Sequence, residues 1–247
     1  MRRALALALA LAVAPMAQAE GVADMSPTEK AAFGEAVRAY LLENPEVIME
    51  AITELQARED RAAANRDLQM LADNKDKIFN SALDWQGGNL SGDITLVEFM
   101  DYRCGYCHKA YEEVEALVKD DGNIRFVLKE FPILGDQSVL TSKFAIATRL
   151  IHGDDTYKKV HDALFTMRGD ATEETLSRLA ADLGLDPAPI LARMATPEVQ
   201  AVIDANYALA QTMEINGTPT FVIDNTMVRG YVPLDGMKDI VAGQREG

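Results

Sequence analysis

Cysteine and histidine are both scarce in this sequence. Its 247 residues hold two cysteines, Cys104 and Cys107, and three histidines, at positions 108, 152 and 161. Two cysteines exclude a framework of several structural disulfides, and leave one Cys-x-x-Cys pair to explain. A tetrahedral zinc site would need two further ligands at short spacing, which makes this class of site improbable on ligand supply alone.

Positive charge and long apolar runs are also in short supply. Lys and Arg total 24 against 39 Asp and Glu, which gives a net charge of −15. Nucleic-acid binding needs basic patches, so this acidity argues against a nucleic-acid partner. No apolar run approaches the roughly 20 residues of a membrane span.

The first 19 residues read as a secretory signal. Arg2 and Arg3 precede a short apolar stretch, residues 4–14, and the small-residue triplet Ala17-Gln18-Ala19 follows it. This is the pattern of a signal peptide with its cleavage site. We therefore expect residues 1–19 to be removed and an exported, soluble chain to begin near Glu20.

Two helical patterns follow, over residues 27–43 and from residue 47 onward, separated by Asn44-Pro45. The stretch 56–67 has almost no large apolar residue, so it is a solvated helix, a partly flexible linker, or a surface helix of the main domain. The apolar residues of the two helices need a partner, and a second copy is the simplest one. We expect an N-terminal helical oligomerisation and linker segment over residues 20–80, whose spacing does not fix the number of subunits.

The remaining residues, 81–247, predict an α/β domain. Strand patterns occupy 94–100 and 124–131, and the cysteines with a helical stretch, 109–118, lie between them. Residues 138–213 are almost wholly helical in pattern, before a hairpin over 220–230 and a closing helix over 234–241. The order predicts a mixed sheet covered by helices, with an inserted helical bundle.

The position of the cysteines predicts a reactive dithiol. Cys104 heads a helix, where free N–H groups and the helix dipole favour a thiolate and lower the thiol pKa. Cys107 lies one turn inside the helix, close enough to attack a mixed disulfide at Cys104. Cys104 is therefore the expected nucleophile and Cys107 the resolving thiol, with no cofactor required. Copper(I) bound by the two sulfurs is a minor alternative.

Residues 97–109, around Cys104-Gly105-Tyr106-Cys107, resemble the active-site segment of the DsbA family of thioredoxin-like proteins. Residues 217–222, Gly-Thr-Pro-Thr-Phe-Val, match the loop in which that family carries a cis proline facing the active-site sulfur. The resemblance implies a thioredoxin-like fold, a cis Pro219 beside Cys104, and Glu98 as a buried proton acceptor. A solvent-facing Glu98 is the alternative.

The residues around the cysteines refine this resemblance. Tyr106 replaces the histidine of strongly oxidising members, and Gly105-Tyr106 with His108 and Thr218 is similar to disulfide isomerases of the DsbC and DsbG type. His108 either adds positive charge or caps the surface. Residues 33–52 resemble the N-terminal region of the ScsC (suppressor of copper sensitivity) proteins, which include trimeric isomerases.

These resemblances imply a periplasmic thiol:disulfide interchange enzyme that isomerises or reduces disulfides in misfolded or reduced exported proteins. They also imply a homo-oligomer, with a trimer favoured, and a membrane redox partner of the DsbD or DsbB type. The alternatives are a DsbA-like dithiol oxidase, or a module that binds copper(I) or holds clients without turnover.

Overall fold

The computed structural model describes residues 25–246, in two compact units that meet at Arg61 and Ala62. Residues 1–19, expected to be a signal peptide, lie outside the described range. Within that range, no helix is both long enough and apolar enough to cross a membrane.

The first unit is helical. Helix α1 (Pro27–Glu43) begins at Ser26, whose hydroxyl accepts a hydrogen bond from the Glu29 amide while the Glu29 carboxylate accepts one from the Ser26 amide. This capping box satisfies two amides that the first helical turn leaves free. Helix α2 (Glu46–Asp73) follows after Asn44-Pro45 and runs across the unit boundary.

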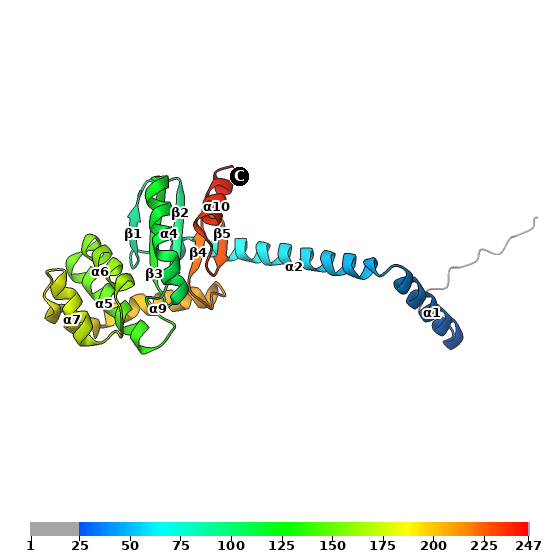
Figure 1. Ribbon diagram of the computed structural model, residues 1–247, viewed down its shortest axis with the longest axis horizontal. Coiled ribbons are helices and arrows are strands. Elements are labelled where there is room, and N and C mark those ends of the chain that lie inside the picture. Colours follow the sequence, from blue (N-terminus) through cyan, green and yellow to red (C-terminus); the bar gives the residue numbers. More distant parts are fainter. Residues whose placement is uncertain (1–24, 247) are drawn as a thin grey trace, which may run out of the picture. The chain divides into compact units, whose positions relative to one another are not determined.

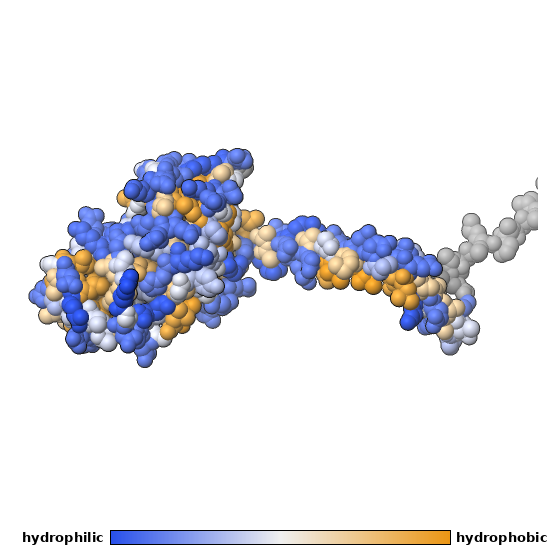
Figure 2. Space-filling model, in the orientation of Figure 1, coloured by the Kyte–Doolittle hydropathy of each residue, from blue (hydrophilic) through white to orange (hydrophobic). Residues whose placement is uncertain are grey.

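Helices α1 and α2 leave most of their apolar side chains exposed. No residue of α1 is buried, and in α2 only Leu71 is. The stretch 56–67 is thus a solvated helix, one of the alternatives left open by the sequence. Apolar side chains gather on one side of α1 and the first half of α2 (Figure 2), and the exposed ones are Phe33, Val37, Tyr40, Leu42, Ile48, Met49, Ile52 and Leu55.

The second unit is built on a five-stranded sheet of order β1-β3-β2-β4-β5 (Figure 1). Its central strands β2 and β3 are parallel, and the other neighbouring pairs are antiparallel. The strands are β1 (Trp85–Gly88), β2 (Ile94–Met100), β3 (Ile124–Glu130), β4 (Thr220–Ile223) and β5 (Thr226–Arg229). The mixed α/β architecture expected from the sequence is confirmed.

Each face of the sheet has its own core. Along β2, Leu96 and Met100 join the core shared with α4 (Gly105–Asp121) and α10 (Leu234–Glu246), while Val97 and Phe99 join the one shared with α3 (Lys75–Phe79) and α9 (Pro197–Thr212). This alternation is that of a strand buried on both faces.

The inserted helices run from α5 to α9, where the helical patterns predict them. They form the part of the second unit that lies beside the sheet (Figure 1). Before α9 come α5 (Asp136–His152), α6 (Asp154–Thr166), α7 (Glu173–Asp182) and α8 (Pro187–Met194).

Strand β1 is not among the strand patterns expected from the sequence. Gly88, at its end, has a φ of 66°, and a Cβ there would come within 2.5 Å of the Ile124 carbonyl oxygen. The compact second unit starts at residue 62. Leu71, Ile78 and Phe79 belong to it, because they are buried in the core under the sheet.

Candidate active site

The two cysteines lie where the chain passes from β2 into α4. Cys104 is the N-cap of α4 and Cys107 lies in its first turn. Both are free thiols, with 7% of Cys104 and none of Cys107 exposed. The Cys104 amide donates to the Asp101 carbonyl at 3.1 Å, which closes the turn leading into the helix.

The surroundings of Cys104 favour its thiolate. A hydrogen bond from Cys107 is the largest cause, followed among the favourable causes by one with Thr218 and by the backbone N–H groups of Cys107 and Tyr106. Together they outweigh the opposing effect of burial and lower the pKa of Cys104 to about 5. Cys104 is therefore almost fully ionised at neutral pH, as a nucleophilic thiol requires.

Cys107 has the opposite character, and Glu98 lies under it. Burial, the hydrogen bond with Cys104 and the negative charge of Glu98 raise the pKa of Cys107 far above its ordinary value. Glu98 is only 4% exposed and does not point to solvent. Burial first, and then the charges of Glu115 and Cys104, raise its pKa to about 8. A carboxyl group with this pKa can hold or accept a proton near neutral pH.

The loop before β4 faces the reactive sulfur. The Thr218–Pro219 peptide bond is cis, and the Cys104 sulfur lies 3.2 Å from the Thr218 carbonyl oxygen, to which it donates when protonated. The Pro219 carbonyl accepts from the Gly230 amide at 2.9 Å, so the loop is tied to the end of β5. A groove of about 270 Å³ runs along it, lined by Glu214, Asn216, Gly217, Thr218, Pro219, Thr220, Arg229 and Gly230.

The residues between and after the cysteines take different surroundings. Tyr106 is 63% exposed, and its ring stacks on Tyr231 with the centroids 6.2 Å apart. Gly105 has open space around it. His108 donates from Nε2 to the Tyr102 carbonyl at 2.7 Å, so it bonds to the protein's own backbone across the Cys-x-x-Cys turn.

Three buried residues beside the cysteines were not singled out from the sequence. Asp101 and Tyr102 precede Cys104 in the chain, and Glu130 ends β3 next to them in space. The available signal was an acidic residue at the end of one buried strand and just after the end of another. Parallel strands end at one edge of a sheet, so Asp101 and Glu130 were bound to lie close together.

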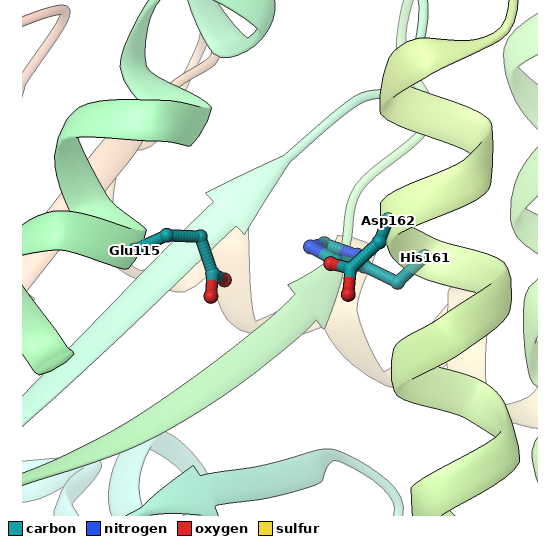
Figure 3. Close-up of side chains that lie close together, drawn as sticks. All are labelled: Glu115, His161 and Asp162. Carbon is teal, nitrogen blue, oxygen red and sulfur yellow. The ribbon is translucent and has the colours of Figure 1, made fainter.

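A second cluster of potential metal ligands lies between α4 and α6. Glu115, His161 and Asp162 point toward one another, with ligand atoms within 4.8 Å (Figure 3). The ammonium group of Lys158 already forms ion pairs with both carboxylates. A protein cation thus already pairs with both carboxylates of the cluster, and Cys104 with Cys107 remain the candidate copper(I) ligands.

Comparisons with known proteins agree with this geometry. The model of the DSBA-like thioredoxin domain matches residues 95–242, well over half of the sequence. The chain belongs to the DSBA-like thioredoxin family. Residues 29–62 also match the N-terminal domain of the copper resistance protein ScsC.

Solved structures of this family share the fold. A thioredoxin-like oxidoreductase from Silicibacter pomeroyi is 40% identical, with a TM-score of 0.66 over 70% of this chain and 99% of that one. BcfH from Salmonella enterica Typhimurium is 28% identical, with a TM-score of 0.72 over 87% and 95% of the two chains. A linker-deletion mutant of Proteus mirabilis ScsC, at 21% identity and a TM-score of 0.68, shows the same fold over 92% of this chain and 99% of that one. Family and neighbours together support an oxidoreductase enzyme.

Curated relatives are more distant. The chain is 26% identical over 157 residues, 62% of its length, to the Na(+)/H(+) antiporter NhaA of Herminiimonas arsenicoxydans, and spans about a quarter (24%) of that protein. It is 22% identical over 62% of its length to disulfide bond formation protein D of Bacillus subtilis, covering 73% of it. The match to the antiporter is thus confined to a minor part of that protein.

Proposed function

We propose that this protein is a periplasmic thiol:disulfide interchange enzyme that isomerises and reduces disulfides in exported proteins. The observation that carries the proposal is the contrast between its two thiols. Cys104 is an ionised sulfur at the start of a helix, and Cys107 is a buried, protonated one beside Glu98. This asymmetry gives each thiol a separate role in disulfide exchange.

The first step belongs to Cys104. Its thiolate attacks one sulfur of a substrate disulfide, forms a mixed disulfide and releases the other substrate sulfur as a thiolate. The polypeptide around the attacked sulfur lies along the groove beside Pro219, where the backbone of an extended peptide can pair with the loop edge. Thr218 and Pro219 are the proposed binding residues.

Two outcomes follow from the mixed disulfide. In isomerisation, a different substrate thiolate attacks the substrate sulfur and returns Cys104 unchanged. In reduction, Glu98 accepts the proton of Cys107, whose thiolate attacks the Cys104 sulfur, so that the substrate leaves reduced and a Cys104–Cys107 disulfide forms. The protein's dithiol supplies both electrons, and a membrane reductant of the DsbD type is the proposed source that restores them.

The helical segment before residue 62 is proposed to join subunits. Its exposed apolar side chains include Phe33, Val37 and Ile48, and none of α1 is buried within the chain. A second copy of the same segment would cover them. The match to the ScsC N-terminal domain supports this role, with a trimer favoured. Several Cys104 sites on one assembly would then reach a single misfolded client.

The test is reactivation of scrambled ribonuclease by the protein lacking residues 1–19, with Cys104→Ala beside it and the molar mass recorded by light scattering. The proposal expects recovery that requires Cys104, from an oligomer. A Val37→Asp/Ile48→Asp double variant should become monomeric and lose most of this recovery while it still reduces insulin. The matched control Arg58→Asp, on the exposed part of α2, should stay oligomeric.

Other results would select the alternatives. Fast oxidation of a reduced peptide by a monomer, with no ribonuclease recovery, would indicate a dithiol oxidase recharged by a DsbB-type partner. Tight copper(I) binding at Cys104 and Cys107, with neither activity, would indicate sequestration.

A further inference from the structure

A buried carboxylate lies behind the active-site turn, apart from Glu98. Glu130 ends β3 and is 3% exposed. Its Oε1 atom accepts hydrogen bonds from the hydroxyl of Tyr102 at 2.9 Å and from that of Tyr157 at 2.7 Å. Tyr102 lies two residues before Cys104, whereas Tyr157 belongs to α6. The same oxygen therefore holds one residue of the active-site turn and one residue remote from it in the chain.

Tyr102 is tied to the Cys-x-x-Cys turn on both sides. Its main chain leads directly to Cys104, and its carbonyl oxygen accepts the 2.7 Å hydrogen bond from His108, the residue after Cys107. Its ring packs against Phe165, with centroids 5.0 Å apart. Movement of Tyr102 would therefore displace both ends of the turn.

The direction of the hydrogen bonds around Tyr102 follows from the ionisation of Glu130, whose pKa burial raises to about 7. When ionised, Glu130 can only accept, so it takes the single hydroxyl proton of Tyr102, and the Nδ1–H tautomer of His161 donates to the Tyr102 oxygen at 3.1 Å. Burial and the charge of Lys158 keep the pKa of His161 well below its ordinary value, which leaves the ring neutral. The other side of His161 faces Glu115 and Asp162 (Figure 3).

Asp101 fixes the residue next to Tyr102 in a parallel way. Its carboxylate accepts from the Ile133 and Leu134 amides at 2.8 and 3.0 Å, and from the Arg103 amide at 2.7 Å. Two consecutive residues before Cys104 are thus held, Asp101 to the loop after β3 by its own carboxylate and Tyr102 to the last residue of β3 by the carboxylate of Glu130.

We propose that Glu130 and Tyr102 are positioning residues that keep the Cys104 sulfur aligned with the free amides at the N-terminus of α4. The proposal rests on the assignment of Cys104 as the nucleophile, and adds the group that keeps it aligned. Thiolate stabilisation by helix amides depends on direction and distance. A turn released from Glu130 would lose part of that alignment while the helix stayed formed.

Two tyrosine variants separate positioning from structure. Tyr102→Phe and Tyr157→Phe each remove one hydrogen bond to the same Glu130 oxygen and keep the buried ring, but only Tyr102 adjoins the turn. We expect Tyr102→Phe to lower the acid dissociation constant of Cys104 about three- to tenfold, the factor that corresponds to the loss of one hydrogen bond. Thiolate absorbance near 240 nm against pH measures this constant. The equilibrium constant for reduction of the Cys104–Cys107 disulfide by glutathione should fall by a similar factor.

The Tyr157→Phe variant should keep both values within about twofold, and it should melt above Tyr102→Phe, which also loses the hydrogen bond with His161. Glu130→Gln, which still offers an oxygen to both hydroxyls, should behave like the wild type, and Glu130→Ala like Tyr102→Phe. Equal shifts in the two tyrosine variants, or none in either, would overturn the proposal. Because thiolate absorbance is read without any substrate, this failure is distinguishable from a failure of the proposed isomerase activity.

Discussion

The sulfur of Cys104 lies 3.2 Å from the carbonyl oxygen of Thr218, 114 residues later in the chain, and donates a hydrogen bond to it when protonated. The contact joins the start of α4 to the loop before β4, so the reactive sulfur adjoins Thr218, one of the residues that line the Pro219 groove. Ionisation of Cys104 removes this hydrogen bond, and a substrate disulfide would then meet the thiolate with its own backbone on the loop edge.

The first prediction concerns the pH dependence of Cys104. Because its pKa is lowered to about 5, alkylation of the reduced protein by iodoacetamide should reach half its maximal rate near pH 5. Cys107→Ala removes the largest cause of that shift and should move the midpoint to higher pH. A wild-type midpoint near the ordinary thiol value of about 8.5 would contradict the assignment.

The second prediction concerns Glu98 and stability. Its pKa rises from 4.5 to about 8 on folding, so the folded chain keeps a proton that the unfolded chain releases. The stability it contributes is full below about pH 4.5 and is lost as the pH rises toward 8. Glu98→Gln should abolish this loss, which amounts to at most about 4 kcal/mol between pH 4 and 8.

Urea unfolding of reduced wild type and Glu98→Gln at both pH values measures the difference. The variant should also release mixed disulfides more slowly, since Cys107 loses its proton acceptor. Identical pH dependence of the two proteins would rule out a raised pKa at Glu98.

Most of the fold followed from local patterns in the sequence. Strands 94–100 and 124–130, the helix 27–43 and the hairpin near residue 225 are confirmed, because each has apolar periodicity bounded by turn residues. Strand β1 could not be predicted, since its glycines are explained only by close approaches in the folded chain, of Gly87 to the Trp85 ring and of Gly88 to Ile124. The second unit includes the residues from 62 onward because Leu71 and Ile78 are buried against distant parts of the chain. Helical periodicity does not reveal which core such residues join.

The candidate site could be predicted as a set of residues but not as a network. Spacing and resemblance predict Cys104, Cys107, Glu98 and Pro219 as site residues, and the structure brings them close together. The bond from Tyr102 to Glu130 joins residues 28 positions apart through side chains, and neither has a spacing rule that predicts it. An acidic residue at the end of a buried strand was the one visible sign of Glu130.

The third prediction concerns a buried ion pair on the opposite face of the sheet. Lys129 bonds to the Asp84 carboxylate and to the Lys77 carbonyl, and both charged side chains are 1% exposed. Burial lowers the pKa of Lys129, while Asp84 opposes that shift. Asp84→Asn should cost about 3–5 kcal/mol of unfolding free energy, because it leaves a buried charge unpaired.

A double variant, Asp84→Asn with Lys129→Met, should recover most of that loss, since no buried charge remains. Cys104 alkylation should stay unchanged in it, because the pair lies on the face away from α4. A double variant no more stable than Asp84→Asn alone would show that the pair is not the source of the cost. Chemical denaturation of the three proteins decides this.

The separate roles of the two thiols are tested most directly by trapping the mixed disulfide. Cys107→Ala and Cys104→Ala are each incubated with a disulfide-bonded client peptide, and the products are measured by mass spectrometry without reductant. The account predicts a stable adduct of the peptide on Cys104 in the Cys107→Ala variant, and no adduct in the Cys104→Ala variant. Adducts on Cys107, or none on Cys104, would contradict it.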